Sequence, residues 1–276
     1  MKKGFSHIIV LIGMLLVTAG CSNYQKLLKS TNVDEKYEAA LKYYEKEDYY
    51  RANQLLNDVL PMLGGRPEGE RARFLFAHTH FMQREFLLSA YQFQLFYETY
   101  PRSEFAEEAI FLYAKSQYMS SPGYEQDQST TRTALESLLE FQSRFPNSQF
   151  AEETNNMINE LNVKLDRKAF DSARLYYQLR YYKSAVVALT NFINEHAGSP
   201  YSEEASFLRL DAQYRFALES VQNKQQERFN EAVEFYLSFI DLHPQGKYLR
   251  DAEKVYENTL AELDKLKKPT QVSQGN

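Results

Sequence analysis

The sequence contains no tryptophan and only one cysteine, Cys21, among its 276 residues. A single cysteine excludes an intramolecular disulfide framework and a metal site built from several thiolates. Glycine and proline are also scarce, with 10 and 8 residues, and because these residues punctuate strands and tight turns, their scarcity favours long helices. The net charge of -5 opposes binding to the phosphate backbone of nucleic acids. We therefore expect no nucleic-acid partner.

Motifs of catalysis and metal binding are also missing from the sequence. It has no Gly-x-Ser-x-Gly elbow, no phosphate-binding loop and no dinucleotide glycine fingerprint. His78 and His80 are two residues apart, so a helix would point them in different directions, and His196 and His243 stand alone in the sequence. These observations predict that the protein is not an enzyme and that it carries neither a metal ion nor a cofactor.

The N-terminus has the order of a lipoprotein signal. Two lysines precede an apolar run at residues 8–17, which is too short to cross a bilayer, and small residues follow up to Cys21. This order predicts a secretory signal peptide over residues 1–20. The small residues before Cys21 resemble the lipobox of bacterial lipoproteins, whose cysteine is acylated with fatty acids such as palmitate, although Thr18 stands where that motif usually has leucine. We predict a lipid anchor on Cys21, followed by a lipid-anchored N-terminal segment over residues 21–32. The alternative is an exported protein whose cysteine is incidental.

A short pattern around proline recurs along the chain. Each copy carries a serine or glycine, at positions 103, 148, 199 and 246, and the copies are 45 to 51 residues apart. A period of this length indicates stacked repeat units. Proline would end one helix, and Ser103 and Ser148 would cap the next helix, whose first-turn glutamates favour the positive end of the helix dipole. These glutamates are therefore expected to be helix-start residues rather than catalysts.

Small and aromatic residues recur within a 34-residue frame. Ala40, Tyr43 and Ala52 in the first unit correspond to Ala173, Tyr176 and Ala185 in the fourth. The pattern resembles the tetratricopeptide repeat, in which small residues let two helices approach and aromatic residues fill the space beside them. The predicted fold is all-α: a right-handed superhelical solenoid of about five tetratricopeptide-like helical hairpins plus a C-terminal helix. It would span residues 33–267, with a disordered tail over residues 268–276, and most of the 21 tyrosines and 19 phenylalanines would lie in its core and between its repeats.

Two of the units carry insertions, at residues 120–128 and 220–228. Each reads as a loop longer than a tight repeat requires. Such loops are common places for partner contact, but inert extensions have the same appearance. The sequence leaves these two interpretations equally open.

Several segments resemble the BamD family, the lipoprotein component of the outer-membrane β-barrel assembly (BAM) complex. The likeness extends from Cys21 to about Leu263, and the segments that carry it are residues 21–30, 36–44, 48–52, 121–134 and 224–228. The resemblance implies attachment to the inner leaflet of the cell outer membrane, facing the periplasm. It also implies that the C-terminal repeats, here the region Ala205–Leu260, bind the POTRA domains of BamA. The N-terminal repeats would meet the C-terminal targeting strand of unfolded outer-membrane β-barrel proteins.

In the repeat frame, the first helix of each hairpin lines the concave surface. In the first two hairpins we predict that these side chains form a groove for the client strand. The alternative is that they pack against the N-terminal segment. The groove candidates are Tyr37, Leu41, Tyr44, Leu75, Thr79 and Met82.

Two other functions fit the same sequence. One is a different envelope scaffold lipoprotein, associated with cell division or the cell wall. The other is a surface nutrient-binding lipoprotein on a helical repeat, but such proteins are usually much longer and stack sugars on tryptophan, which this chain lacks.

Overall fold

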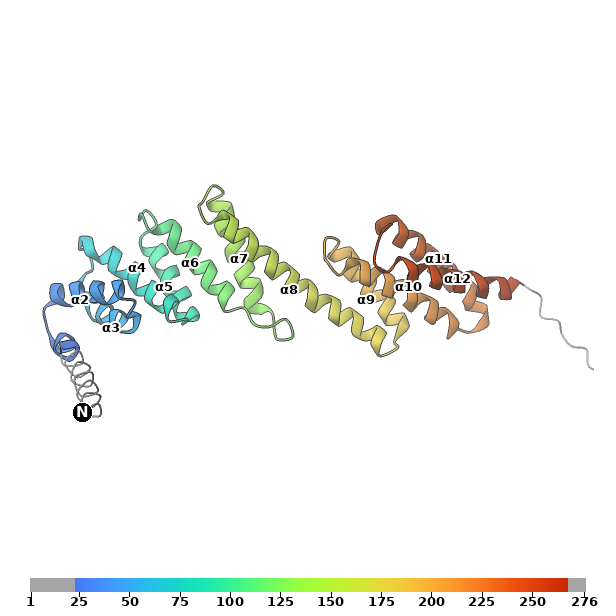
Figure 1. The fold of residues 1–276 in the computed structure, drawn as a ribbon, viewed down its shortest axis with the longest axis horizontal. Coiled ribbons are helices and arrows are strands. Elements are labelled where there is room, and N and C mark those ends of the chain that lie inside the picture. The colour runs from blue at the N-terminus through green and yellow to red at the C-terminus, as the bar shows by residue number, and fades with distance from the viewer. Residues whose placement is uncertain (1–22, 268–276) are drawn as a thin grey trace, which may run out of the picture. The chain divides into compact units, whose positions relative to one another are not determined.

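The computed structural model describes residues 23–267, and all regular structure in this range is helical. This confirms the predicted all-α repeat fold (Figure 1). Cys21, the predicted signal peptide at 1–20 and the predicted tail at 268–276 lie outside the described residues. Residues 23–29 are helical. The helices that follow are α2 (Val33–Glu45), α3 (Tyr49–Val59), the short 3-10 helix η1 (Leu60–Met62), α4 (Pro67–Met82), α5 (Phe86–Thr99), α6 (Ala106–Met119), α7 (Ser129–Arg144), α8 (Ala151–Gln178), α9 (Tyr182–Glu195), α10 (Ser202–Leu218), α11 (Gln222–Leu242) and α12 (Leu249–Lys267).

The chain divides into two compact units. Unit 1 runs to Pro122 and resumes at Ser129–Ile158, and unit 2 consists of Gly123–Gln128 and everything from Asn159 onward. Unit 1 contains the hairpins α2/α3, α4/α5 and α6/α7. The boundary falls within α8, and unit 2 contains the rest of α8 from Asn159 with α9, the hairpin α10/α11, and α12, which packs on both α10 and α11.

Small residues allow the helices of each hairpin to lie close together, as the repeat frame predicts. Ala40 and Ala52 are fully buried in the first hairpin, and Ala185 is fully buried in the fourth. Ala185 belongs to a core cluster with Leu189 and Phe192. Because a buried alanine leaves no room beside its Cβ, these positions set the distance between helices.

One aromatic position of the frame behaves differently from the prediction. Tyr176 was expected to fill the space beside Ala173, but its side chain is 45% exposed. The neighbouring Tyr177 packs against the core of unit 2 instead. Adjacent residues of a helix point about 100° apart, so a shift of one position moves the ring from solvent to the core.

The two helices of three hairpins are joined by the same kind of turn. Glu47, Arg84 and Arg180 adopt left-handed backbone conformations with φ values of 60°, 62° and 62°. The N–H of each donates to the carbonyl three residues earlier, at 2.9 Å in all three turns. An aromatic pair brackets each turn edge to face: Tyr44 and Tyr49 with centroids 5.6 Å apart, Phe81 and Phe86 at 5.7 Å, and Tyr177 and Tyr182 at 6.0 Å.

The recurring serines shape turns instead of capping helices, so the predicted capping role is wrong. α6 begins at Ala106 with Phe105 as its N-cap, two residues beyond Ser103. The Ser103 hydroxyl accepts the Phe105 N–H at 3.1 Å, and the Ser148 hydroxyl accepts the Phe150 N–H at 3.1 Å. A serine side chain that satisfies a backbone N–H two residues ahead stabilises a turn. The helix therefore starts after this turn.

Each of these turns places an aromatic ring on the first helix of the preceding hairpin. The ring belongs to the residue two positions after the recurring serine or glycine, and it stacks nearly parallel to its partner. Such stacking explains much of the aromatic excess. The pairs are Phe105 on Phe74 with centroids 4.9 Å apart, Phe150 on Phe111 at 4.1 Å, Tyr201 on Phe170 at 5.3 Å and Tyr248 on Phe207 at 5.2 Å.

A glutamate in the first turn of α6, and another in the first turn of α10, forms a hydrogen bond with the serine or glycine turn of the next repeat. The Ser148 hydroxyl donates to Glu107 Oε1 at 2.6 Å, and the Tyr248 N–H donates to Glu203 Oε1 at 2.8 Å. Gly246 stands where the other copy has Ser148, and a Cβ there would collide with the Glu203 carboxylate. The acidic residues therefore link successive repeats.

The two insertions differ in structure. Residues 120–128 lie between α6 and α7 outside any helix, and Lys168 Nζ of α8 donates to the carbonyls of Glu125 and Gln126 at 3.0 and 2.7 Å within unit 2. Residues 222–228, by contrast, form the first turns of α11. The predicted loop at 220–228 is therefore mostly wrong, because its glutamine, lysine, glutamate and arginine residues are good helix formers.

Replacing Ala185 with tryptophan tests the close helix contact in the fourth hairpin. The added ring has no space at a fully buried position, so we expect the free energy of unfolding to fall by about 3 kcal/mol and the Tm to fall with it. Val187→Trp on the same helix is the control, because Val187 is 56% exposed and its change is expected within about 0.5 kcal/mol. Equal melting of both variants and the parent would contradict the packing described.

Replacing Arg180 with glycine tests the left-handed turn between α8 and α9. The φ of 62° costs a side-chain-bearing residue roughly 1 kcal/mol, which glycine avoids, although glycine gains more freedom on unfolding. We expect a net stabilisation of about 0.5 kcal/mol in urea unfolding. Arg180→Ala removes the same charge without relieving the backbone and should give no stabilisation. A higher free energy of unfolding for Arg180→Ala than for Arg180→Gly would rule out this explanation.

Candidate functional site

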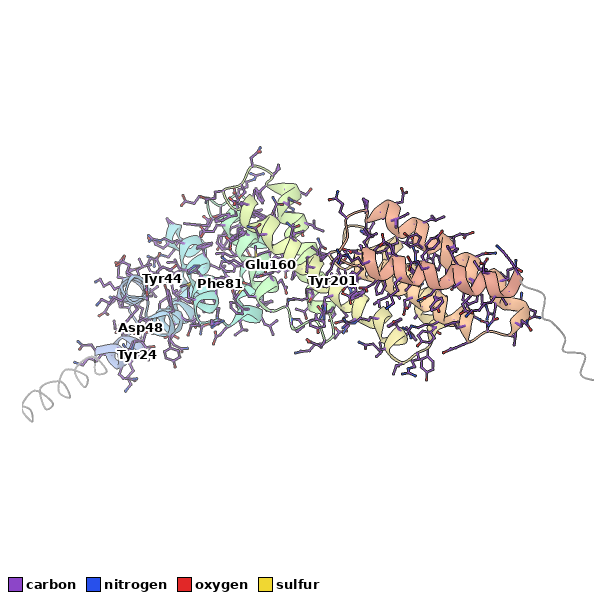
Figure 2. The ribbon with its side chains drawn as sticks, turned by 45° about the vertical axis from the view of Figure 1, so that its right-hand side comes forward. Tyr24, Tyr44, Asp48, Phe81, Glu160 and Tyr201 are labelled. Carbon is purple, nitrogen blue, oxygen red and sulfur yellow. The ribbon has the colours of Figure 1, made fainter. Side chains whose placement is uncertain are left out.

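The first helices of neighbouring hairpins contact each other through residues 34 positions apart. In unit 1, the Tyr44 hydroxyl of α2 lies 2.8 Å from His78 Nδ1 of α4. One hairpin later, Lys115 Nζ of α6 lies 5.8 Å from the ring centre of Phe81 on α4 (Figure 2 labels Tyr44 and Phe81). This separation equals the frame inferred from the sequence. The first helices of unit 1 therefore form one continuous face, which we call the first-helix face.

The predicted groove residues are buried to very different degrees. Met82 is 42% exposed, and Leu41 and Tyr44 are half-buried. Tyr37 and Leu75 are 6% and 7% exposed. The accessible part of the predicted groove thus consists of Leu41, Tyr44 and Met82, whereas Tyr37 and Leu75 are buried.

Thr79 is a residue of α4 that contacts α3 and has no exposed surface. Its hydroxyl donates to the Phe76 carbonyl at 2.7 Å and accepts from Asn53 Nδ2 at 2.8 Å. Asn53 Nδ2 also donates to His80 Nε2 at 3.1 Å, and His80 Nδ1 donates to Glu85 Oε2 at 2.6 Å. In this structure Thr79 therefore belongs to a buried hydrogen-bond network that joins the first two hairpins, and it does not line an open groove.

Burial favours the neutral forms of the titratable groups on the first-helix face. It raises the pKa of Tyr44 to about 12 and lowers the pKa of the His78 imidazole. It also raises the pKa of the Glu108 carboxyl on α6. A neutral imidazole with its proton on Nε2 can accept a hydrogen bond from the Tyr44 hydroxyl at Nδ1. The face thus presents aromatic, hydrogen-bonding groups whose charge is suppressed by burial.

Sequence reasoning missed three members of this face. The sequence was read only to exclude a metal site at His78 and His80, although the spacing of 34 residues from Tyr44 could have placed His78 beside that ring. Arg71 follows Tyr37 by the same spacing, is exposed, and lies close enough to Tyr37 and Tyr44 to lower the pKa of both. Glu108 had no sequence signal, because its approach to Tyr44 depends on how α6 packs.

The N-terminal segment docks on the first hairpin through a different set of side chains. Tyr24 is 7% exposed, packs edge to face on Tyr43 at 5.6 Å and lies 5.3 Å from the Arg51 guanidinium. Lys36 Nζ donates to the Leu28 carbonyl at 2.9 Å and pairs with an Asp58 carboxylate oxygen at 2.9 Å. These contacts hold residues 23–29 against α2 and α3.

Unit 2 repeats the contact between first helices with charged partners. The Tyr177 hydroxyl donates to Asp211, and Arg215 Nε lies 2.5 Å from the same carboxylate oxygen. Burial, followed by the hydrogen bond to Asp211, raises the pKa of Tyr177 to about 12. An ion pair therefore occupies the place that the neutral Tyr44–His78 pair has in unit 1.

Two observations on residues 23–267 concern metal binding and membrane spanning. Within this range no three histidine, cysteine, aspartate or glutamate side chains gather as metal ligands would. None of the helices described there combines the length and apolar character that a membrane span requires.

The stacked hairpins and their shared first-helix face define a helical-repeat protein. The chain belongs to the YfiO family of outer membrane lipoproteins, whose family model matches residues 29–182, more than half of the sequence. The match supports the resemblance drawn from the sequence at the level of the family. No curated protein matches the chain.

The pKa of His78 predicts how stability depends on pH. Because burial lowers it from 6.5, the unfolded chain binds a proton just below pH 6.5 while the folded chain does not, so folding stability is lost as pH falls through that value. We expect the free energy of unfolding of the parent to fall more steeply below pH 6.5 than that of His78→Gln. Urea unfolding above and below this pH measures the difference between the two proteins. Glu108, whose pKa burial raises, is present in both and so does not contribute to that difference. Parallel pH profiles would contradict the burial of a neutral imidazole.

Proposed function

We propose that the protein is a non-enzymatic assembly factor for outer-membrane β-barrel proteins. In this proposal it is a periplasmic lipoprotein scaffold of the BamD type. Unit 1 takes the targeting strand of unfolded β-barrel clients, and unit 2, within Ala205–Leu260, binds the POTRA domains of BamA in the BAM complex. The family match supports this role, because it places the chain among outer membrane lipoproteins.

The character of the first-helix face is the observation that carries the client proposal. Leu41, Tyr44 and Met82 offer partly exposed apolar and aromatic surface, and such surface suits the aromatic residue that ends a β-barrel targeting strand. Arg71 stands exposed beside Tyr44, where its guanidinium can pair with the terminal carboxylate of the strand. Burial favours the neutral forms of Tyr44 and His78, so covering this pair with a peptide desolvates no charge there.

The lipid anchor on Cys21 completes the proposal. Three acyl chains on the first residue of the mature protein, each contributing about 0.8 kcal/mol per buried CH₂, would hold it on the periplasmic face of the outer membrane. The other candidate is an envelope scaffold with a different partner. The same face would then bind a peptide from that partner.

Site-specific photocrosslinking tests the client site. Benzoylphenylalanine at Leu41, Tyr44 or Met82 should capture a peptide with the C-terminal sequence of an outer-membrane barrel. The same probe at Leu139 on α7 is the control, since Leu139 is 45% exposed against 42% for Met82. Equal capture at Leu139, or none at the three face positions, would defeat the groove assignment.

Isolation of the anchored protein from envelopes in mild detergent tests the partner. We expect BamA to accompany it, and mass spectrometry of the N-terminus to find acylated Cys21. Recovery of the acylated chain with other envelope proteins and without BamA would favour the second scaffold candidate. An unmodified Cys21 would remove the anchor from the proposal.

A further inference from the structure

One end of unit 1 carries an exposed surface that the client proposal does not use. It combines the N-terminal segment with the start of α3, and we call it the anchor-proximal surface. Tyr24, Gln25, Asp48, Tyr50 and Arg51 line a depression of about 370 Å³ there. Tyr24 and Asp48 are labelled near the N-terminal end of the described chain in Figure 2. Tyr50 is 65% exposed, so its ring is accessible to a partner.

The anchor-proximal surface is part of the folded first hairpin. The Arg51 guanidinium lies 5.3 Å from the Tyr24 ring and 5.6 Å from the Tyr43 ring, and it pairs with Asp48 at 2.9 Å. Lys36 holds the other end of the segment through the Leu28 carbonyl. Within the described residues, the chain is thus packed against the first hairpin from its first turn onward.

The distance from the anchor residue to this surface is short. Cys21 precedes Tyr24 by three residues, and a fully extended chain of that length spans about 10 Å. The headgroup layer of one leaflet is roughly 5 to 8 Å thick. A lipid on Cys21 therefore keeps the surface around Tyr24 within reach of the headgroups.

The side chains at this surface suit a lipid interface. Tyrosine concentrates at the boundary between lipid and water because its ring is apolar and its hydroxyl is polar. Lys26 and Lys29 are exposed on the same segment, and their ammonium groups can approach lipid phosphates at an anionic surface.

We propose that the anchor-proximal surface, with Tyr50 at its centre, rests in the phospholipid headgroup layer and so fixes how the first hairpin faces the membrane. The proposal rests on the lipid anchor of the proposed function. It adds a second, non-covalent contact with the bilayer.

The absence of tryptophan makes single-tryptophan fluorescence a direct test. Tyr50→Trp places a reporter at the surface, while Tyr91→Trp and Tyr181→Trp are controls of matched exposure, at 60% and 61% against 65% for Tyr50. Each mature chain is coupled through Cys21 to a maleimide phospholipid in vesicles of phosphatidylethanolamine and phosphatidylglycerol. We expect the emission of the position-50 reporter alone to shift to shorter wavelength on coupling and to be quenched by lipids that carry a spin label on the headgroup.

The outcomes distinguish membrane contact by the anchor-proximal surface from attachment through the lipid on Cys21. Unchanged emission at position 50, or equal shifts at all three positions, would overturn the proposal. Because the lipid is attached chemically, neither result depends on whether cells acylate Cys21, which mass spectrometry of the native protein decides. Replacing Tyr50 with serine in the coupled Tyr91→Trp chain should leave the emission unchanged, as a check that the fold survives the loss of the ring.

Discussion

Ring stacking between hairpins is the interaction on which the rest of this structure depends. A two-helix hairpin cannot bury both faces of its helices, so it needs its neighbours. Here an aromatic residue at the N-terminal end of one hairpin stacks on the first helix of the preceding hairpin. Phe150 stacks on Phe111 with ring centroids 4.1 Å apart, and Tyr201 stacks on Phe170 with centroids 5.3 Å apart. Aromatic pairs contribute roughly 0.5 to 1.5 kcal/mol beyond the area that they bury. Where the first two hairpins meet, Arg66 and Asp34 form an ion pair at 2.6 Å at the corresponding start of α4.

The packing of successive hairpins, by ring stacking or, between the first two, beside the ion pair of Arg66 and Asp34, also creates the surface to which we assign function. It brings successive first helices side by side, so residues 34 positions apart touch. Within unit 1 the contact is the neutral pair of Tyr44 and His78, and within unit 2 it is the charged cluster of Tyr177, Asp211 and Arg215. An apolar peptide loses little on covering neutral groups, whereas a satisfied ion pair resists being desolvated. The two units are therefore suited to partners of different chemistry.

Several features of the fold and site could be predicted from the sequence, and others could not. Buried alanines such as Ala40 and Ala185 follow from periodicity, because a helix contact tolerates only small residues there. The capping role of Ser103 failed because a serine can satisfy a backbone N–H in a turn as well as at a helix start. Thr79 failed as a groove residue because one helical position separates an open face from a packed one. Glu108 could not be found at all, since only packing brings α6 near Tyr44.

By itself, the sequence determined the helical class, the repeat period, the position of the candidate lipid anchor and the family. These are properties of spacing and composition, which local physics and short motifs encode. The tertiary structure decided which tyrosines are buried, which histidine meets Tyr44, and that the N-terminal segment lies against the first hairpin. Those outcomes depend on contacts between residues distant in the chain, whose geometry is set only when the hairpins pack against one another.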